Sequence, residues 1–236
     1  MFFKSSTPKS AYPHRVLINL AGVFLKIILR PSYKVSKRLQ LLGDLASYQI
    51  WLFDTFGKVK VRNSRERIWL DMHKSLDGRE FIGVEFGVAW GYLTHFWFAH
   101  SSPTILEWHG FDTFTGLPRP WRNHPIGSFS AGGRTPDLKD QRIEWHIGSV
   151  EDTIHTLWIP PQRKQALVVF FDLDIYEPSL ICWERIKRHL LPGDILYFDE
   201  AFDKDERQLL TSSIFPHGDF EFVSANWISL ALRYVK

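Results

Sequence analysis

The 236-residue sequence contains one cysteine, and no CxxC or Cys/His cluster occurs in it. A single cysteine excludes an internal disulfide bond, and the missing cluster argues against a structural zinc site. Cys182 lies in a helical pattern beside Trp183, which favours buried packing over a nucleophilic role. The apolar segment 16–30 is too short for a membrane span, which needs ~20 residues. With 44% hydrophobic and 23% charged residues, the composition is that of a soluble globular protein.

Acidic residues are absent before Asp44, although that stretch holds eight of the 29 basic residues. The rest of the chain therefore carries 21 basic against 26 acidic residues, a net charge of about −5. The overall charge of +3 thus divides into a basic N-terminal arm and a mildly acidic domain. An acidic domain disfavours nucleic acid as a partner.

Residues 1–35 are predicted to form a basic leader. Basic residues flank the apolar segment 16–30, a pattern typical of a helix that lies in the plane of a membrane surface. No small-x-small cleavage site follows Leu29, which disfavours a secretory signal. A helix packed on the domain, or on a second subunit of a homo-oligomer, stays open. We expect a cytoplasmic protein, membrane-associated if the in-plane helix forms.

Residues 36–80 are predicted to form a helical cap. Apolar residues recur there at helical spacing. Asn63 with Glu66 three residues later resembles a capping box, which predicts a helix that the Asp77-Gly78 pair ends.

From residue 81 to 236, strand and helix patterns alternate. This alternation predicts an α/β domain with a parallel sheet and helices on both faces. The last two strand patterns are too close for a parallel crossover, so they predict an antiparallel hairpin that completes a seven-stranded, mostly parallel sheet. The predicted strands are 81–85, 106–112, 142–147, 166–172, 194–199, 220–224 and 227–234.

A glycine turn follows the first predicted strand. Glu85 ends the strand, and Gly87 and Gly91 come directly after it. A strand, a tight glycine turn and a helix let backbone amides approach a ligand closely. The spacing is Glu-x-Gly-x-x-x-Gly, not the Gly-x-Gly-x-x-Gly of dinucleotide-binding turns. A ligand with an amino-acid ammonium group would explain the carboxylate beside the turn.

Carboxylates end four of the five predicted parallel strands. Ligands of open α/β sheets bind beyond the carboxyl ends of the strands, so these acids are candidate site residues. Asp112 lies 25 residues after Gly87, near the ~20-residue spacing at which an acid meets a ribose hydroxyl. The acids are Glu85, Asp112, Asp172, Asp174, Asp199 and Glu200.

At these segments the sequence resembles the class I S-adenosylmethionine-dependent methyltransferases, and within them the macrocin O-methyltransferase family. The resemblance implies the Rossmann-like fold of that class and covers about residues 81–200. It is carried by Val84-Glu85-Phe86-Gly87-Val88-Ala89-Trp90-Gly91, Gly110-Phe111-Asp112-Thr113-Phe114-Thr115-Gly116-Leu117-Pro118, Asp172-Leu173-Asp174-Ile175-Tyr176-Glu177-Pro178-Ser179, Leu191-Pro192-Gly193-Asp194 and Phe198-Asp199-Glu200.

The resemblance implies S-adenosyl-L-methionine as the cofactor. The acidic glycine turn would hold its methionine part, Asp112 its ribose hydroxyls, and residues 149–151 would lie near its adenine. The implied cofactor residues are Glu85, Gly87, Gly91, Asp112, Ser149, Val150 and Glu151.

The resemblance also implies a Mg²⁺ ion held by Asp174, Asp199 and Glu200, and carboxylate oxygens suit that metal. Asp172 and Asp174 are the candidate catalytic residues, with Asp172 as the base or a second metal contact. Where the family has two aspartates after the fifth strand, this chain has Asp199-Glu200. An acidic helix N-terminus is the alternative interpretation of that pair.

We therefore expect a methyltransferase that methylates a hydroxyl of a small molecule or glycoside with metal assistance. The alternatives are a metal-independent O- or N-methyltransferase and a non-catalytic, cofactor-binding partner subunit. The long loop 113–140 is a candidate lid, and Trp121 and His124 on it either line the acceptor site or belong to an ordinary surface loop. His109 and His146 fall in predicted strands and are expected to be structural.

Overall fold

The computed structural model describes residues 33–236. The chain divides into two compact units, Met1–Gly43 and Asp44–Lys236. Residues 33–43 begin helix α2 (Tyr33–Phe56), and the second unit contains every described strand. The predicted leader up to residue 32, with the membrane-surface segment 16–30, lies outside the described residues. Within the described part, no helix has the length and apolar character needed to cross a bilayer.

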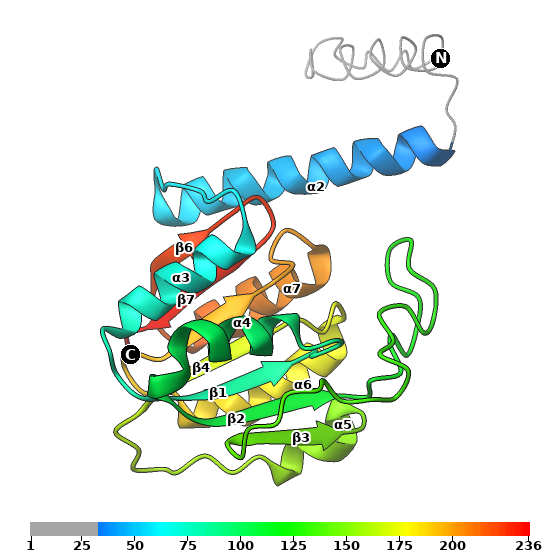
Figure 1. Ribbon diagram of the computed structural model, residues 1–236. Coiled ribbons are helices and arrows are strands. Elements are labelled where there is room, and N and C mark those ends of the chain that lie inside the picture. Colours follow the sequence, from blue (N-terminus) through cyan, green and yellow to red (C-terminus); the bar gives the residue numbers. More distant parts are fainter. Residues whose placement is uncertain (1–32) are drawn as a thin grey trace, which may run out of the picture. The chain divides into compact units, whose positions relative to one another are not determined.

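A seven-stranded sheet is the centre of the second unit, in the order β3-β2-β1-β4-β5-β7-β6 (Figure 1). The first five strands are parallel, and β7 inserts antiparallel between β5 and β6. This arrangement confirms the predicted mostly parallel sheet with a C-terminal antiparallel hairpin. The strands are β1 (Phe81–Phe86), β2 (Ile105–Asp112), β3 (Ile143–Ile147), β4 (Ala166–Phe171), β5 (Ile195–Phe198), β6 (Phe220–Ala225) and β7 (Leu230–Tyr234).

Helices cover both faces of the sheet. Side chains from α3 and α4 pack on one face, and side chains from α6, α7 and the part of α2 in the second unit (residues 44–56) pack on the other. The α-helices after α2 are α3 (Arg65–Leu76), α4 (Tyr92–Ser101), α5 (Val150–Thr153), α6 (Tyr176–Ile186) and α7 (Lys204–Leu209). Shorter 3₁₀ and π segments are η1 (Ser102–Thr104), η2 (Ile154–Thr156), η3 (Lys187–His189), η4 (Leu210–Ile214) and η5 (Phe215–His217).

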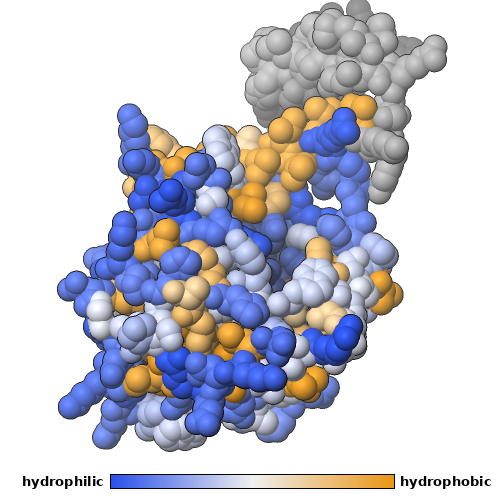
Figure 2. Space-filling view, viewed as in Figure 1, coloured by the Kyte–Doolittle hydropathy of each residue, from blue (hydrophilic) through white to orange (hydrophobic). Residues whose placement is uncertain are grey.

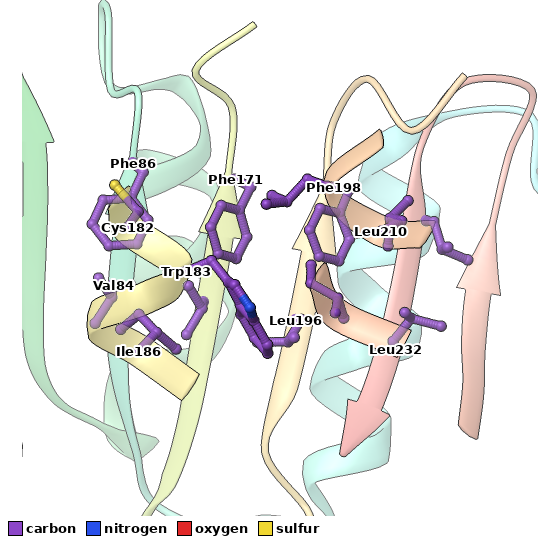
Figure 3. Close-up of a cluster of buried hydrophobic side chains, with 14 of the residues drawn as sticks. Val84, Phe86, Phe171, Cys182, Trp183, Ile186, Leu196, Phe198, Leu210 and Leu232 are labelled. Carbon is purple, nitrogen blue, oxygen red and sulfur yellow. The ribbon is translucent and has the colours of Figure 1, made fainter. Parts of the chain in front are cut away.

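Successive side chains of the central strands point to opposite faces of the sheet and so contribute to two hydrophobic cores. In β4, Leu167, Val169 and Phe171 enter one core, and the residues between them enter the other. All six residues of β4 are buried, which is typical of a parallel strand covered on both faces. Figure 3 shows the first core, in which Phe171 and Phe198 stack with ring centroids 5.1 Å apart. Cys182 is fully buried in this core, which confirms its predicted packing role.

Helix α3 begins one residue later than the capping-box prediction. Its N-cap is Ser64, so the prediction that Asn63 caps the helix is wrong. Serine and asparagine are equally good N-cap residues, and the pattern could not rank two neighbours. The predicted end is confirmed, because Asp77 is the C-cap with a left-handed φ of 51°. The buried face of α3 packs on the sheet and shares its second core with Phe81.

Candidate active site

A cavity of about 880 Å³ opens at the carboxyl ends of β1, β2, β4 and β5. Figure 2 shows the hollow between these strand ends and the long segment that connects β2 to β3. Its size is within the range of small-molecule and cofactor sites. The lining includes Arg65, Trp69, Glu85, Gly87, Val88, Tyr92, Asp112, Leu117, Trp121, His124, Phe129, Ser149, Val150, Glu151, Asp172, Asp174, Asp199 and Glu200.

The turn after β1 approaches the end of β4 closely at Gly87. A Cβ on Gly87 would lie 1.9 Å from the carbonyl oxygen of Asp172, and the residue has a φ of +89°. Glycine is therefore required here both by conformation and by contact. Gly91 also has a positive φ, but a Cβ there would meet Pro136 at 2.5 Å. Although the structure describes Gly91, it is not part of the cavity lining.

Asp112, at the end of β2, ties the glycine turn to the loop that follows β2. Its Oδ2 accepts hydrogen bonds from the backbone N–H groups of Val88 (2.8 Å) and Ala89 (2.7 Å). Its Oδ1 accepts one from Phe114 N–H at 2.7 Å. An ionised carboxylate has about four acceptor positions, so one remains for a ligand. The sequence predicted Asp112 as a ligand residue but not this role in holding the turn.

Glu85 is a buried carboxylate on the cavity wall. Its Oε2 accepts hydrogen bonds from the Thr94 hydroxyl and from Trp108 Nε1, the latter at 3.0 Å. Burial raises the pKa of Glu85 to about 8, against the opposing effect of these two donors. At neutral pH this side chain is therefore largely protonated and can donate as well as accept a hydrogen bond.

Acids from β4, β5 and the segment after β5 converge on the same end of the cavity. Asp172 follows β4 and Asp174 lies two residues on, with a left-handed φ of 61°. Asp199 and Glu200 follow β5. Arg65 of α3 contacts this group, with its Nη1 3.3 Å from Asp199 Oδ2, and Tyr197 donates its hydroxyl hydrogen bond to Asp199.

The pKa values of these acids are raised together. Burial, followed by the charge of Asp199, raises the pKa of Asp174 to about 7 and that of Glu200 to about 8. Burial and the charges of Asp199, Asp174 and Glu200 raise the pKa of Asp172 well above its ordinary value. Like charges in a poorly solvated site disfavour ionisation, and a bound cation would relieve that cost.

Glu206 of α7 is a fifth acid of this cluster that the sequence did not predict. It is buried, and one oxygen accepts a hydrogen bond from Glu200 N–H at 2.9 Å. The other oxygen, Oε1, has no hydrogen-bond partner. Burial and the charges of Glu200, Asp172 and Asp199 raise its pKa. A buried carboxylate oxygen without a hydrogen-bond partner, close to four other acids, suits a divalent cation.

The structure thus brings the predicted cofactor, catalytic and metal residues to one cavity, Gly91 excepted. The carboxylate oxygens of Asp174, Asp199 and Glu200, however, do not all lie within 4.8 Å of one another, the spacing at which three residues could share a metal ion. Within residues 33–236, the group of three whose ligand atoms all lie within 4.8 Å of one another is on β2 and β3 instead. Arg65 and Tyr197 had no sequence signal, because one lies on a helix before the sheet and the other reads as an ordinary strand residue.

The loop between β2 and β3 contributes aromatic side chains to the cavity. Trp121 and His124 form a two-residue bridge, with Trp121 N–H donating to the His124 carbonyl at 3.0 Å and the reverse bond at 2.8 Å. Their rings stack with centroids 5.7 Å apart. Trp121 is 8% exposed and packs with Leu117 and Ile175. Both predicted loop residues therefore line the cavity.

Comparison with known proteins identifies the fold. No family model matches the chain, and no curated protein matches it either. Among solved structures, the calicheamicin methyltransferase CalS11 aligns with a TM-score of 0.52 and 20% identity, over 98% of this chain and 95% of that chain. The O-methyltransferase NovP aligns with a TM-score of 0.51 and 14% identity, over 76% of this chain and 84% of that chain.

The chain therefore has the Rossmann-like fold of the class I methyltransferases, as its sequence predicts. The narrower resemblance to the macrocin O-methyltransferase family is not confirmed.

Proposed function

We propose that this protein is an S-adenosylmethionine-dependent methyltransferase that methylates a hydroxyl of a small molecule or glycoside. One observation carries the proposal. Within a methyltransferase fold, a glycine turn, Asp112 and an acidic cluster face one cavity of about 880 Å³. Fold alone does not assign function, so the argument depends on the chemistry of these residues.

The residues around the glycine turn fit the cofactor. S-adenosylmethionine, when bound, supplies a methyl group on a positively charged sulfur. The open acceptor position on Asp112 suits a ribose hydroxyl, and Glu85, on the wall of the same cavity, would hydrogen-bond to the amino or carboxyl group of the methionine part. Ser149, Val150 and Glu151 line the cavity near Asp112, which suits the adenine. Gly91, the N-cap of α4, closes the same turn with a hydrogen bond from its N–H to the Val88 carbonyl at 2.8 Å.

The acidic cluster fits the deprotonation of an acceptor. A carboxylate with a pKa near the working pH is an efficient general base, and Asp174 has a pKa of about 7. Without a metal, Asp174 would take the proton of the acceptor hydroxyl; with Asp174 bound to Mg²⁺, its neighbour Asp172 would take it. Asp174, Asp199 and Glu200 would hold Mg²⁺, which lowers the pKa of a bound hydroxyl.

A metal-independent methyltransferase is the second candidate, and a specific observation favours it. Both carboxylate oxygens of Asp199 already have partners, since Tyr197 donates to Oδ1 and Arg65 pairs with Oδ2. In that mechanism Arg65 and Tyr197 keep Asp199 in place, and Asp172 and Asp174 orient and deprotonate the acceptor.

Methyl transfer to a panel of glycosides, sugars and phenols tests the proposal. We expect mass spectrometry to show one added methyl group on an acceptor oxygen. Asp174→Asn should lower the turnover by about 10²–10⁴-fold, the usual contribution of a general base. Asp219→Asn is the control, because Asp219 is exposed immediately before β6 and should keep wild-type turnover.

Metal removal separates the two mechanisms. If Mg²⁺ is held as proposed, EDTA should stop turnover and added Mg²⁺ should restore it. Turnover that EDTA leaves unchanged would establish the metal-independent mechanism. A protein that binds the cofactor but methylates no acceptor would contradict the enzyme assignment and favour a partner subunit.

A further inference from the structure

Two histidines and a glutamate meet on β2 and β3, outside the cofactor cavity. His109 and His146 are 8% and 6% exposed, and His109 pairs with Glu144 in the register of the two strands. His109 Nδ1 lies 3.2 Å from His146 Nε2 and 3.4 Å from Glu144 Oε2, and His146 Nε2 lies 3.9 Å from the same oxygen. Three atoms that can bind a metal therefore face one point.

The hydrogen bonds on the far sides of the rings are compatible with the tautomers that bind a metal. When the Thr156 hydroxyl donates to the Thr153 carbonyl, it accepts from His146 Nδ1, 2.7 Å away. A protonated Nδ1 leaves a lone pair on Nε2 of the neutral ring.

His109 follows the same logic with the opposite nitrogen. When its Nε2 donates to Glu107 Oε2, 3.4 Å away, its Nδ1 is the nitrogen with the lone pair. In this tautomer two nitrogen lone pairs and a carboxylate point at one another, and a cation between them would satisfy all three. In the other tautomer His109 Nδ1–H donates to His146 Nε2, and a metal ion would displace that proton.

The separations fit a tetrahedral zinc ion. Metal–ligand bonds of about 2.0–2.2 Å at a tetrahedral angle place ligand atoms about 3.3–3.5 Å apart. Two of the three observed separations, 3.2 and 3.4 Å, are close to this, and the third needs to shorten by only a few tenths of an ångström from 3.9 Å.

The surroundings resemble the outer shell of a metal site. Metal-bound histidines typically donate their second ring nitrogen to a nearby oxygen, and Thr156 offers such an oxygen to His146 and Glu107 to His109. Phe111 stacks on the His146 ring, with centroids 4.0 Å apart and an angle of 4° between the planes. The ring orientation is therefore held before any ion binds.

We propose that His109, His146 and Glu144 bind a zinc-class divalent transition metal. Two imidazoles and one carboxylate are ligands that zinc accepts, and the side chain of Glu144 is 63% exposed, which leaves the fourth position open to water. The ion joins β2 to β3, an edge strand of the sheet. Sequence spacing could not predict this site, because 37 residues separate the two histidines.

Titration calorimetry with Zn²⁺ on the full chain tests the site. We expect one equivalent to bind in wild type, and His146→Gln and Glu144→Gln to weaken that binding by at least 10-fold. Co²⁺ in the same site should give the visible absorption of a tetrahedral complex. His155→Gln is the matched control, since His155 is exposed on η2 and should leave binding unchanged.

Two further variants show whether the zinc ion is bound at this site. Asp174→Asn should also leave this equivalent in place, which distinguishes it from an ion in the acidic cluster. Glu144 is exposed, so Glu144→Gln stays informative if His146→Gln fails to fold. Absence of zinc uptake in wild type, with a proton held between the histidines instead, would overturn the proposal. Unchanged binding in Glu144→Gln and His146→Gln would overturn it too.

Discussion

Glu85 illustrates how burial at one residue makes the stability of the whole domain depend on pH. Its pKa is about 8 in the folded chain, against about 4.3 for an unperturbed glutamate. Between these values the folded state holds a proton that the unfolded state has released. The free energy of unfolding therefore falls as the pH rises, by up to about 1.4 kcal/mol per pH unit for this residue.

Glu85→Gln should remove that contribution. A glutamine oxygen can still accept from Trp108 Nε1 and Thr94, but the side chain does not titrate. We expect urea unfolding between pH 5 and 8 to show a smaller decline in the free energy of unfolding for the variant. The two slopes should differ by up to about 1.4 kcal/mol per pH unit, which corresponds to one bound proton. The acids of the cluster contribute equally to both proteins. Parallel pH profiles for wild type and variant would contradict the pKa of Glu85.

At the scale of elements, the close approach of the β1 turn to β4 shapes the floor of the cavity. Gly87→Ala places a Cβ against the Asp172 carbonyl and also strains a positive φ. We expect it to lower the stability by more than the ~1 kcal/mol of φ strain alone, and to weaken S-adenosylhomocysteine binding by at least 10-fold.

Gly78→Ala separates the φ strain from the contact with β4. Gly78 has a φ of +74°, but no atom lies within 4 Å of a Cβ there. It should therefore cost only the φ strain and leave ligand binding unchanged. Equal losses of stability in the two variants, with ligand binding intact in both, would show that the contact with β4 is unimportant.

The elements themselves were largely predictable from sequence, and for a physical reason. Buried parallel strands such as Ala166–Phe171 are continuous apolar runs, and the close spacing of the last two strands admits only a hairpin. The start of α3 was not predictable to the residue, because Asn63 and Ser64 both suit an N-cap. When two neighbouring residues favour the N-cap equally, tertiary packing decides which of them begins the helix.

At the scale of the whole molecule, strand order decides which acids meet. Because the carboxyl ends of parallel strands share one edge of the sheet, the sequence could predict that Asp112, Asp172 and Asp199 line one site. It could not predict Arg65 or Glu206, which helices on opposite faces of the sheet bring to the cluster. Nor could it predict that His109 and His146 meet across two strands.

The central claim is that this cavity binds the cofactor of a methyltransferase. Titration calorimetry with S-adenosylhomocysteine on wild type, Asp112→Asn and Asp219→Asn tests it most directly. An asparagine side chain has only one acceptor oxygen, so in Asp112→Asn the turn at Val88 and Ala89 or the bond to Phe114 loses its support. We predict one equivalent bound by wild type and by Asp219→Asn, and binding at least 10-fold weaker for Asp112→Asn. No binding by wild type, or equal binding by all three proteins, would contradict the account.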